Sequence, residues 1–238
     1  MAVYACSDLH GTHFLESIKK HIGPEDTVIF CGDAGDRGTR SWETIKAILD
    51  DSRFKYRKGN HEDMLVETLK LYLAGECYSD ELFLLSYNGG SQTFQDAIAD
   101  PDVREIVQKL DQLPLYEEYI NTRGERIFLS HAGFTPWKSG MSDQDVLIPY
   151  AGDLLWSRDH FLDEWSADEC VDCYIVHGHT PIPYLLEDID PCCTMGEIEP
   201  GALWYCDGRK CCIDTGAVFT GQCVLLDLDT WEEHIFVV

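Results

Sequence analysis

The segment Cys31-Gly32-Asp33-Ala34-Gly35-Asp36-Arg37-Gly38 brings two carboxylates, one guanidinium and three glycines together in eight residues. It follows the apolar run 27–31 (TVIFC), which is typical of a buried parallel strand. Asp33 would emerge at the carboxyl end of this strand, where open α/β sheets place their ligands. The glycines allow a sharp turn and a close approach to a ligand. Alone, the segment could still be a glycine-rich surface turn, so the other strand ends must decide its meaning.

The N-terminal part repeats one order of elements three times: a short apolar strand, a polar segment and an amphipathic helix. The expected strands span 3–6, 27–31 and 54–57. The polar segments that follow them are SDLHG (7–11), GDAGDRG (32–38) and GNHE (59–62). This alternation predicts βαβ units and a mostly parallel sheet.

The alternation of strands and helices stops at residues 75–113, where aromatic and acidic residues mix with helical patterns. We interpret this stretch as a helical insertion over one side of the sheet. Beyond it, 115–120 and 126–129 flank Asn121-Thr122-Arg123-Gly124, which indicates a hairpin. Later strands are expected at 174–176, 222–228 and 234–238, and a long acidic, cysteine-rich loop at 187–208.

The overall composition narrows the function classes. At 238 residues the chain is expected to form one domain, 1–238, because single domains commonly reach about 250 residues. The net charge of −25 argues against general nucleic-acid binding and against anchoring to an anionic membrane. No apolar run approaches the roughly 20 residues that span a bilayer, and the N-terminus does not resemble a signal peptide. We therefore expect a soluble, cytoplasmic protein.

The eleven cysteines allow two interpretations. Several lie in apolar runs and are expected to be reduced core thiols, as is usual without a secretory segment. Seven others could hold a structural zinc ion, namely Cys170, Cys173, Cys192, Cys193, Cys206, Cys211 and Cys212. Their spacing matches no regular zinc pattern, so core thiols are favoured.

Asp8 and His10 are the first candidate ligands for a metal ion. Two residues apart, they can point to the same side of an extended segment. One carboxylate and one imidazole suit iron, manganese or zinc better than calcium. On its own, an Asp-x-His sequence on a loop is weak evidence.

Taken together, five strand ends carry SDLHG, GDAGDRG, GNHE, HAG (131–133) and HGHT (177–180). In order and spacing this set resembles the phosphoprotein phosphatase family of calcineurin-like metallophosphoesterases, over nearly the whole chain. NGGSQT (88–93), LLWSR (154–158) and IDTGA (213–217) match its bacterial and bacteriophage branch more closely. The resemblance implies an α/β (α+β) fold, a four-layer αββα sandwich with a helical insertion.

The resemblance also implies a centre of two divalent metal ions, with manganese favoured and iron or zinc as alternatives. The first ion would be held by Asp8, His10 and Asp33, and the second by Asp33, Asn60, His131 and His179. His177 is an alternative to His179, but the family ligand is the histidine after the glycine. Two dications would lower the pKa of a shared water, so that hydroxide attacks phosphorus.

Four side chains are expected to act on the substrate. Arg37 and Arg158 would clamp the phosphate, with Asn60 also contacting it. His61 would be the general acid and Asp36 would orient it. Arg158 could instead form a simple ion pair on a helix. Glu62 is expected to pair or cap at its helix start.

These features predict a metallophosphoesterase that hydrolyses phosphomonoesters, with phosphoserine or phosphothreonine in proteins as the leading substrate. A symmetrical dinucleoside tetraphosphate hydrolase is the alternative, because the motifs act on the phosphate and not on its substituent. A third hypothesis is an inactive, metal-bound scaffold that recognises partners through acidic insertions. Every expected catalytic position is filled, which disfavours the scaffold.

Overall fold

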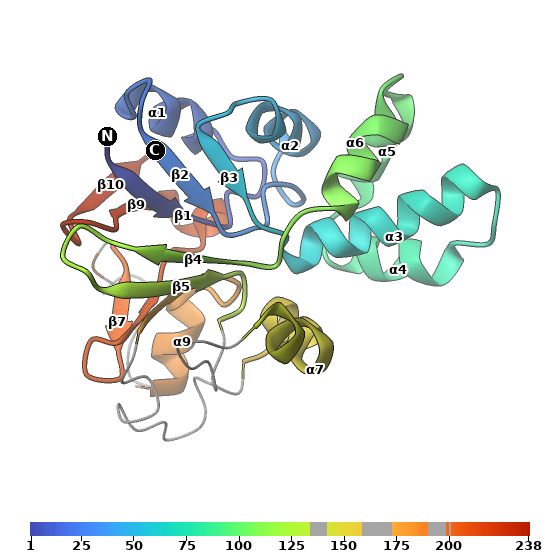
Figure 1. Ribbon diagram of the computed structural model, residues 1–238. Helices are drawn as coiled ribbons and strands as arrows, with labels where there is room; N and C mark the ends of the chain where they lie inside the picture. The colour runs from blue at the N-terminus through green and yellow to red at the C-terminus, as the bar shows by residue number, and fades with distance from the viewer. Residues whose placement is uncertain (134–141, 159–172, 190–198, 200) are drawn as a thin grey trace.

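The computed structural model describes residues 1–133, 142–158, 173–189, 199 and 201–238, and within them two five-stranded sheets form the centre of the fold (Figure 1). Sheet A contains β1 (Val3–Cys6), β2 (Thr27–Phe30), β3 (Phe54–Tyr56), β9 (Gln222–Asp227) and β10 (Glu233–Val237), in the order β10-β9-β1-β2-β3. Sheet B contains β4 (Tyr116–Ile120), β5 (Arg126–Ser130), β6 (Tyr174–His177), β7 (Leu203–Tyr205) and β8 (Lys210–Cys212), in the order β4-β5-β6-β8-β7.

Both sheets are mixed. The parallel pairs that the βαβ pattern predicts are present, because β1 pairs with β2 and β2 with β3 in parallel register. In sheet B, β6 lies parallel to both β5 and β8. The remaining pairs, β1 with β9, β9 with β10, β4 with β5 and β7 with β8, are antiparallel. The predicted hairpin around 121–124 is confirmed as the β4–β5 connection.

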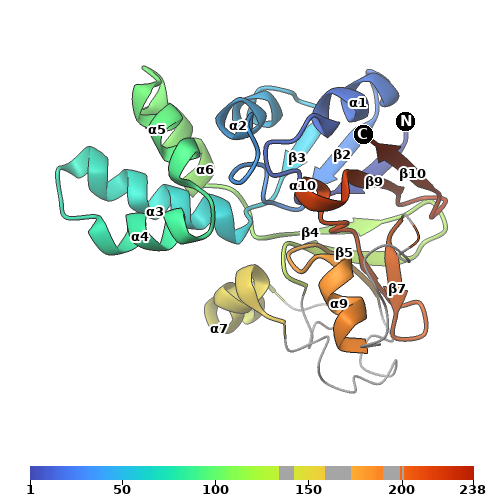
Figure 2. The ribbon, with the colours of Figure 1, turned by 180° about the vertical axis from the view of Figure 1, so that it is seen from behind.

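Helices cover the outer faces of the two sheets. Sheet A is covered by α1 (Phe14–His21) and α2 (Ser41–Leu49), which share a buried apolar cluster with β1 and β2. Sheet B packs against α7 (Asp143–Trp156) and α9 (Ile182–Ile189). Seen from behind in Figure 2, the short helix α10 (Ala217–Thr220) lies beside β9. The layers therefore follow the order helix, sheet, sheet, helix.

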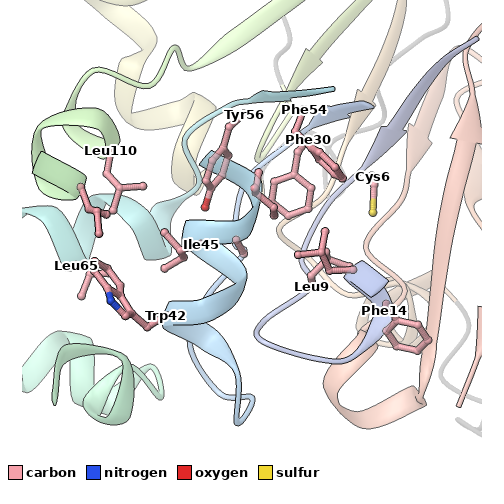
Figure 3. Close-up of a cluster of buried hydrophobic side chains, with 14 of the residues drawn as sticks. Cys6, Leu9, Phe14, Phe30, Trp42, Ile45, Phe54, Tyr56, Leu65 and Leu110 are labelled. Carbon is pink, nitrogen blue, oxygen red and sulfur yellow. The ribbon is translucent and has the colours of Figure 1, made fainter. Parts of the chain in front are cut away.

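The alternation of side chains along the strands explains this layering. Ala5 and Ile29 point from sheet A toward Ile127 and Leu129 of sheet B, in the cluster between the sheets. Their neighbours point the other way, because successive side chains of a strand face opposite sides. Figure 3 shows this second cluster, which includes Cys6 and Phe30 from the strands, Phe14 from α1, and Trp42 and Ile45 from α2.

Four helices extend to one side of the sandwich (Figure 1). They are α3 (Asn60–Ala74), α4 (Ser79–Tyr87), α5 (Ser91–Ala99) and α6 (Val103–Asp111). The last three occupy the stretch 75–113 that the sequence predicts as a helical insertion. Leu65 of α3 and Leu110 of α6 belong to the same apolar cluster as Trp42 (Figure 3), so the insertion is continuous with the core of sheet A. The organisation as one domain stays a prediction.

The predicted loop at 187–208 is wrong at both ends. It contains β7, and α9 continues to Ile189. Cys170, Cys192 and Cys193 of the possible zinc group lie outside the described residues, while Cys173, Cys211 and Cys212 are buried. Among the described residues, no cysteine belongs to a cluster that could hold a metal ion. None of the helices described is long and apolar enough to cross a membrane.

Candidate metal centre and active site

The strand ends of both sheets bring the predicted ligands together. Asp8 and His10 follow β1, Asp33 follows β2, Asn60 begins α3, His131 follows β5 and His179 follows β6. All six are buried, none being more than 8% exposed. Two overlapping groups have ligand atoms within 4.8 Å of one another: His10 with Asp33 and His61, and Asp8 with Asp33 and His131. Asp33 is common to both groups.

Asp33 lies at the centre of the cluster. Its Oδ2 is 3.7 Å from His10 Nε2 and 3.5 Å from His131 Nε2. These two histidines come from different sheets, so Asp33 stands between them. Asp33 Oδ2 thus lies within 3.7 Å of a histidine from each sheet, and its bridging of two cations stays a prediction. His61 Nε2 is also 3.7 Å from Asp33 Oδ2, so the proposed general acid lies directly beside Asp33.

Lone pairs of Asn60, His131 and His179 converge where the second metal ion is predicted. His131 donates its Nδ1 proton to the carbonyl of Cys31 at 2.8 Å, which leaves a lone pair on Nε2. That atom is 2.7 Å from Asn60 Oδ1 and 3.1 Å from His179 Nδ1, and Asn60 Oδ1 is 3.1 Å from His179 Nδ1. Three electron-pair donors at such short range fit a shared cation better than they fit one another.

Asp8 and His10 offer a similar donor set where the first metal ion is predicted. His10 donates from Nδ1 to the Gly35 carbonyl at 2.7 Å, which aims the Nε2 lone pair at the cluster. The buried Asp8 Oδ1 makes no hydrogen bond and is 3.9 Å from His10 Nε2. Carboxylate oxygens, an amide oxygen and neutral imidazoles suit manganese, iron or zinc. The residues present therefore fit a pair of divalent cations.

Burial favours the neutral forms of the carboxyl and imidazole groups in the cluster. Burial and, next, Asp214 raise the pKa of Asp8 well above its ordinary value, and burial with Asp8 and Glu62 does the same for Asp33. Burial lowers the pKa of His10 and His131, and it lowers that of His179 to about 3. These imidazoles stay neutral at pH 7, as metal ligands must. Cations would relieve the repulsion between the two carboxylates.

Beside the cluster, Asp36, His61 and Arg37 form a hydrogen-bonded chain. His61 donates from Nδ1 to Asp36 Oδ2 at 2.7 Å, which fixes its tautomer and orientation. The guanidinium of Arg37 donates to His61 Nε2 at 2.9 Å and to His10 Nε2 at 2.6 Å. In this arrangement the proton of His61 is on Nδ1 and its Nε2 accepts from Arg37; the predicted roles of His61 as general acid, Asp36 as its orienting carboxylate and Arg37 as phosphate ligand stay predictions.

Arg158 follows the end of α7 and is exposed. Its charge is close enough to contribute, after burial, to the lowered pKa of His179. The amide of Ala132 donates to the Leu154 carbonyl at 2.8 Å, so the end of α7 is joined to the segment that carries His131. Arg158 is therefore near the centre, although no contact between its side chain and the ligands is described.

The two histidines of the HGHT segment differ in their surroundings. His179 faces His131 and Asn60, and its amide donates to Asp8 Oδ2 at 3.1 Å. His177 contacts the Tyr205 hydroxyl through Nε2 at 2.7 Å, away from the cluster. This geometry favours His179 as the ligand. Asp214 Oδ1 accepts a hydrogen bond from the Gly216 amide at 2.9 Å.

A family model described as calcineurin-like phosphoesterase matches residues 1–212 of the 238. The chain belongs to the calcineurin-like phosphoesterase family. Members of this family are enzymes that depend on a dinuclear metal centre, which agrees with the donor cluster described above.

Two curated proteins and one solved structure illustrate its relatives. A bis(5'-nucleosyl)-tetraphosphatase PrpE (asymmetrical) of Oceanobacillus iheyensis is 25% identical over 65% of this chain and 62% of the relative. The serine/threonine-protein phosphatase 6 catalytic subunit of Drosophila melanogaster is 28% identical over 69% of this chain and 52% of the relative. The matched part thus spans less than two thirds of either relative.

The solved structure is a protein serine/threonine phosphatase from Saccharomyces cerevisiae with similarity to human phosphatase PP5. It aligns with a TM-score of 0.60 at 17% identity, over 100% of this chain and 80% of the other. At this identity the likeness concerns the fold, and the predicted metallophosphatase sandwich is confirmed.

Glu62 has a larger structural role in this phosphoesterase than the sequence predicted. Its buried carboxylate accepts the amides of Asp33, Ala34 and Gly59 at 2.8–2.9 Å and the Tyr56 hydroxyl at 2.7 Å. It does cap the start of α3, as predicted, but it also holds the backbone of the central ligand. The capping pattern of a glutamate at the third helical position was the available signal; the link to Asp33 was not visible.

Left-handed backbone is concentrated at this phosphoesterase's centre. Positive φ angles of 46–71° occur at Asp8, His10, Asp33, Asp36, Arg37 and His179. Such angles are rare for residues with a side chain and cluster at functional sites. The backbone is therefore shaped here to aim side chains.

Proposed function

We propose that this phosphoesterase hydrolyses phosphomonoesters, with phosphoserine or phosphothreonine in proteins as its substrate. The observation that carries this proposal is the Asp36–His61 pair, 2.7 Å apart, beside the bridging carboxylate. A serine or threonine alkoxide is a strongly basic leaving group, so its departure depends on a positioned acid. A nucleotide leaving group is far less basic and depends on that acid less.

The residues would divide the work as follows. Asp8, His10 and Asp33 would hold one divalent cation, and Asp33, Asn60, His131 and His179 the other. When bound, the cations would lower the pKa of the attacking water and polarise the phosphoryl oxygens. Arg37 and Arg158 would bind the phosphate and offset its developing charge, with Asn60 beside it. When Arg37 binds the phosphate instead of His61 Nε2, a His61 protonated on Nε2 would give that proton to the leaving oxygen, and Asp36 would keep the ring oriented through Nδ1.

Manganese is the cation that we propose, since the mixed set of oxygen and imidazole donors accepts it, and iron or zinc would fit the same ligands. The cytoplasmic location expected from the sequence stays a prediction. The similarity to the Drosophila phosphatase subunit supports a phosphoprotein substrate. The Oceanobacillus relative, a tetraphosphatase by name, favours a dinucleoside polyphosphate as the second candidate.

The test compares a phosphoserine peptide with diadenosine tetraphosphate, using the purified protein with manganese. We expect the peptide to be the better substrate and a chelator to abolish its hydrolysis. A higher kcat/KM on the tetraphosphate would transfer the assignment to the second candidate. No hydrolysis of either, with metal supplied, would support the inactive scaffold.

The acid is tested separately by varying the leaving group. His61→Asn should lower kcat on the phosphoserine peptide by about 10²-fold or more, the usual contribution of a general acid, and affect p-nitrophenyl phosphate much less. Asp36→Asn should show the same selectivity with a smaller loss. Full turnover of the peptide by His61→Asn would overturn this role.

A further inference from the structure

The turn Asn88-Gly89-Gly90, here called the NGG turn, joins α4 to α5 at the active-site end of the insertion. Its sequence was singled out above, but the proposed chemistry makes no use of it. The amide of Arg37 donates to the Gly89 carbonyl at 3.0 Å, so the turn contacts the backbone of the proposed phosphate clamp.

Arg37 and its neighbour Asp36 need support from outside their own segment. Both have left-handed backbone, with φ angles of 64° and 68°. Two such residues in succession cost roughly 1 kcal/mol or more each, so surrounding contacts must hold them. Locally, only the bond from the Gly38 amide to the Asp36 carbonyl, 2.6 Å long, is described. The Gly89 carbonyl supplies the partner for the Arg37 amide.

The NGG turn lies so close to these residues that side chains would not fit. A Cβ added at Gly89 would lie 2.9 Å from Arg37 Cγ and 3.5 Å from Arg37 Cα. A Cβ at Gly90 would lie 2.8 Å from Asp36 Oδ2, the oxygen that accepts the His61 proton, and would also clash with Leu85. The NGG turn therefore packs closely against both Arg37, the proposed phosphate ligand, and Asp36, the carboxylate proposed to orient His61.

The NGG turn is itself firmly held. The Gly89 and Gly90 amides donate to the carbonyls of Ser86 and Leu85 at 3.0 and 2.9 Å. Asn88 donates from Nδ2 to the Leu84 carbonyl at 2.9 Å. Leu85 is fully buried beneath the turn. The insertion thus presents a fixed backbone surface to Arg37.

We propose that the NGG turn is a positioning element of the active site, and that Gly89 is the residue that sets the direction of the Arg37 side chain. The proposal rests on the proposed function, because it assigns Arg37 to the phosphate. On this proposal the helical insertion takes part in catalysis, because the backbone of its NGG turn positions Arg37.

The test is Gly89→Ala, with Gly75→Ala and Gly124→Ala as matched controls. All three glycines have positive φ, at 93°, 72° and 78°, but nothing lies within 4 Å of a Cβ at Gly75 or Gly124. The three variants share backbone strain, and only Gly89→Ala meets Arg37. We expect about 10- to 100-fold lower kcat/KM on a phosphoserine peptide for Gly89→Ala, the scale of a displaced catalytic group, and less than about 3-fold for the controls.

A double-mutant cycle with Arg37→Ala separates positioning from a general structural effect. If Gly89 acts through Arg37, Gly89→Ala should cause no further loss in the Arg37→Ala background. The inhibition constant of inorganic phosphate should rise in Gly89→Ala, while the bound metal, measured by elemental analysis, should not change. Additive losses, or a Gly89→Ala variant that behaves like the controls, would overturn the proposal.

Asn88→Ala provides a milder variant should Gly89→Ala not fold. It removes the side-chain bonds of Asn88 to the Leu84 carbonyl of α4 and to Met64 Sδ of α3, and it should lower kcat/KM about 2- to 5-fold, again without effect in the Arg37→Ala background. Equal effects in both backgrounds would contradict the proposal. If the unsubstituted chain hydrolyses no phosphoester, the proposed function fails and this inference fails with it; if it does, the Gly89 comparison tests this inference alone.

Discussion

At the scale of single residues, the centre combines strained backbone with buried charge. Six functional candidates have positive φ angles, and each costs roughly 1 kcal/mol or more. Asp8 and Asp33 are also buried carboxyl groups, and charge on such groups is unfavourable unless partners compensate. Contacts from neighbouring segments must therefore keep the ligands in place, and Glu62 supplies three of them to backbone amides.

Glu62→Gln should weaken both the fold and the metal site. Glutamine keeps one acceptor oxygen and turns an NH₂ group toward amides that also donate. We expect a loss of about 2–4 kcal/mol in the free energy of unfolding, since buried donors lose their acceptor. Metal affinity should fall about 10- to 100-fold, as for other groups that orient ligands. Urea unfolding of the metal-free protein and a metal titration measure the two effects.

Tyr56→Phe is the matched control for Glu62→Gln. It removes one hydrogen bond to the same carboxylate, at 2.7 Å, and leaves the three amides bonded. A loss near 1 kcal/mol with unchanged metal affinity is expected. If Glu62→Gln binds metal as tightly as Tyr56→Phe does, Glu62 has no part in positioning Asp33.

At the scale of elements, the sequence predicted those strands and turns that depend on local sequence pattern. Buried strands followed by polar turns identified the strand ends on which the candidate ligands lie. The strands β7 and β8 are only three residues each, too short for alternation to be visible, although Asp207-Gly208 between them is a hairpin signal. The contacts of Glu62 with Asp33, 29 residues away, and of Gly89 with Arg37 depend on how elements meet, which no local pattern encodes.

The junction between the insertion and α2 can be tested through Asp100, just after α5. Its Oδ2 accepts Trp42 Nε1 at 2.9 Å and Lys46 Nζ at 2.5 Å, both from α2. The hydrogen bond from Lys46, followed by those from the Asp102 amide and from Trp42, lowers the pKa of Asp100 to about 2. A pKa below the unfolded value of about 3.9 means that this carboxylate stabilises the fold fully above that pH, and the effect disappears as pH falls toward 2.

Asp100→Asn should therefore lower Tm by about 2–4 °C at pH 7. The difference from the unsubstituted protein should shrink between pH 4 and pH 2. Thermal unfolding at several pH values measures it. Asp96→Asn removes the same charge from α5, where the carboxylate accepts only an exposed bond from Gln92, and should have little effect. A Tm difference that persists undiminished at pH 2 would contradict the ionic junction.

At the scale of the whole molecule, the charge distribution bears on substrate choice. The chain has 43 acidic and 18 basic residues, and a net charge of −25. A field of this sign attracts cationic ligands and repels polyanions before any contact is made. Arg37 and the metal ions, in their proposed roles, would bind a phosphate once it has arrived, but they would act over a short range. Basic residues around the phosphorylated side chain would therefore favour a substrate, and additional phosphates would count against it.

Ionic strength should separate the two candidate substrates. The Debye length falls from roughly 20 Å near 0.02 M salt to about 7 Å near 0.2 M, so the field of the molecule is largely screened at the higher value. Added salt should then lower kcat/KM several-fold for a phosphoserine peptide flanked by lysines, and raise it for a glutamate-flanked peptide and for diadenosine tetraphosphate. Measurements at constant free manganese, with a weakly coordinating salt, isolate this effect. Parallel salt responses of all three substrates would mean that local contacts alone, and not the acidic surface, determine selectivity.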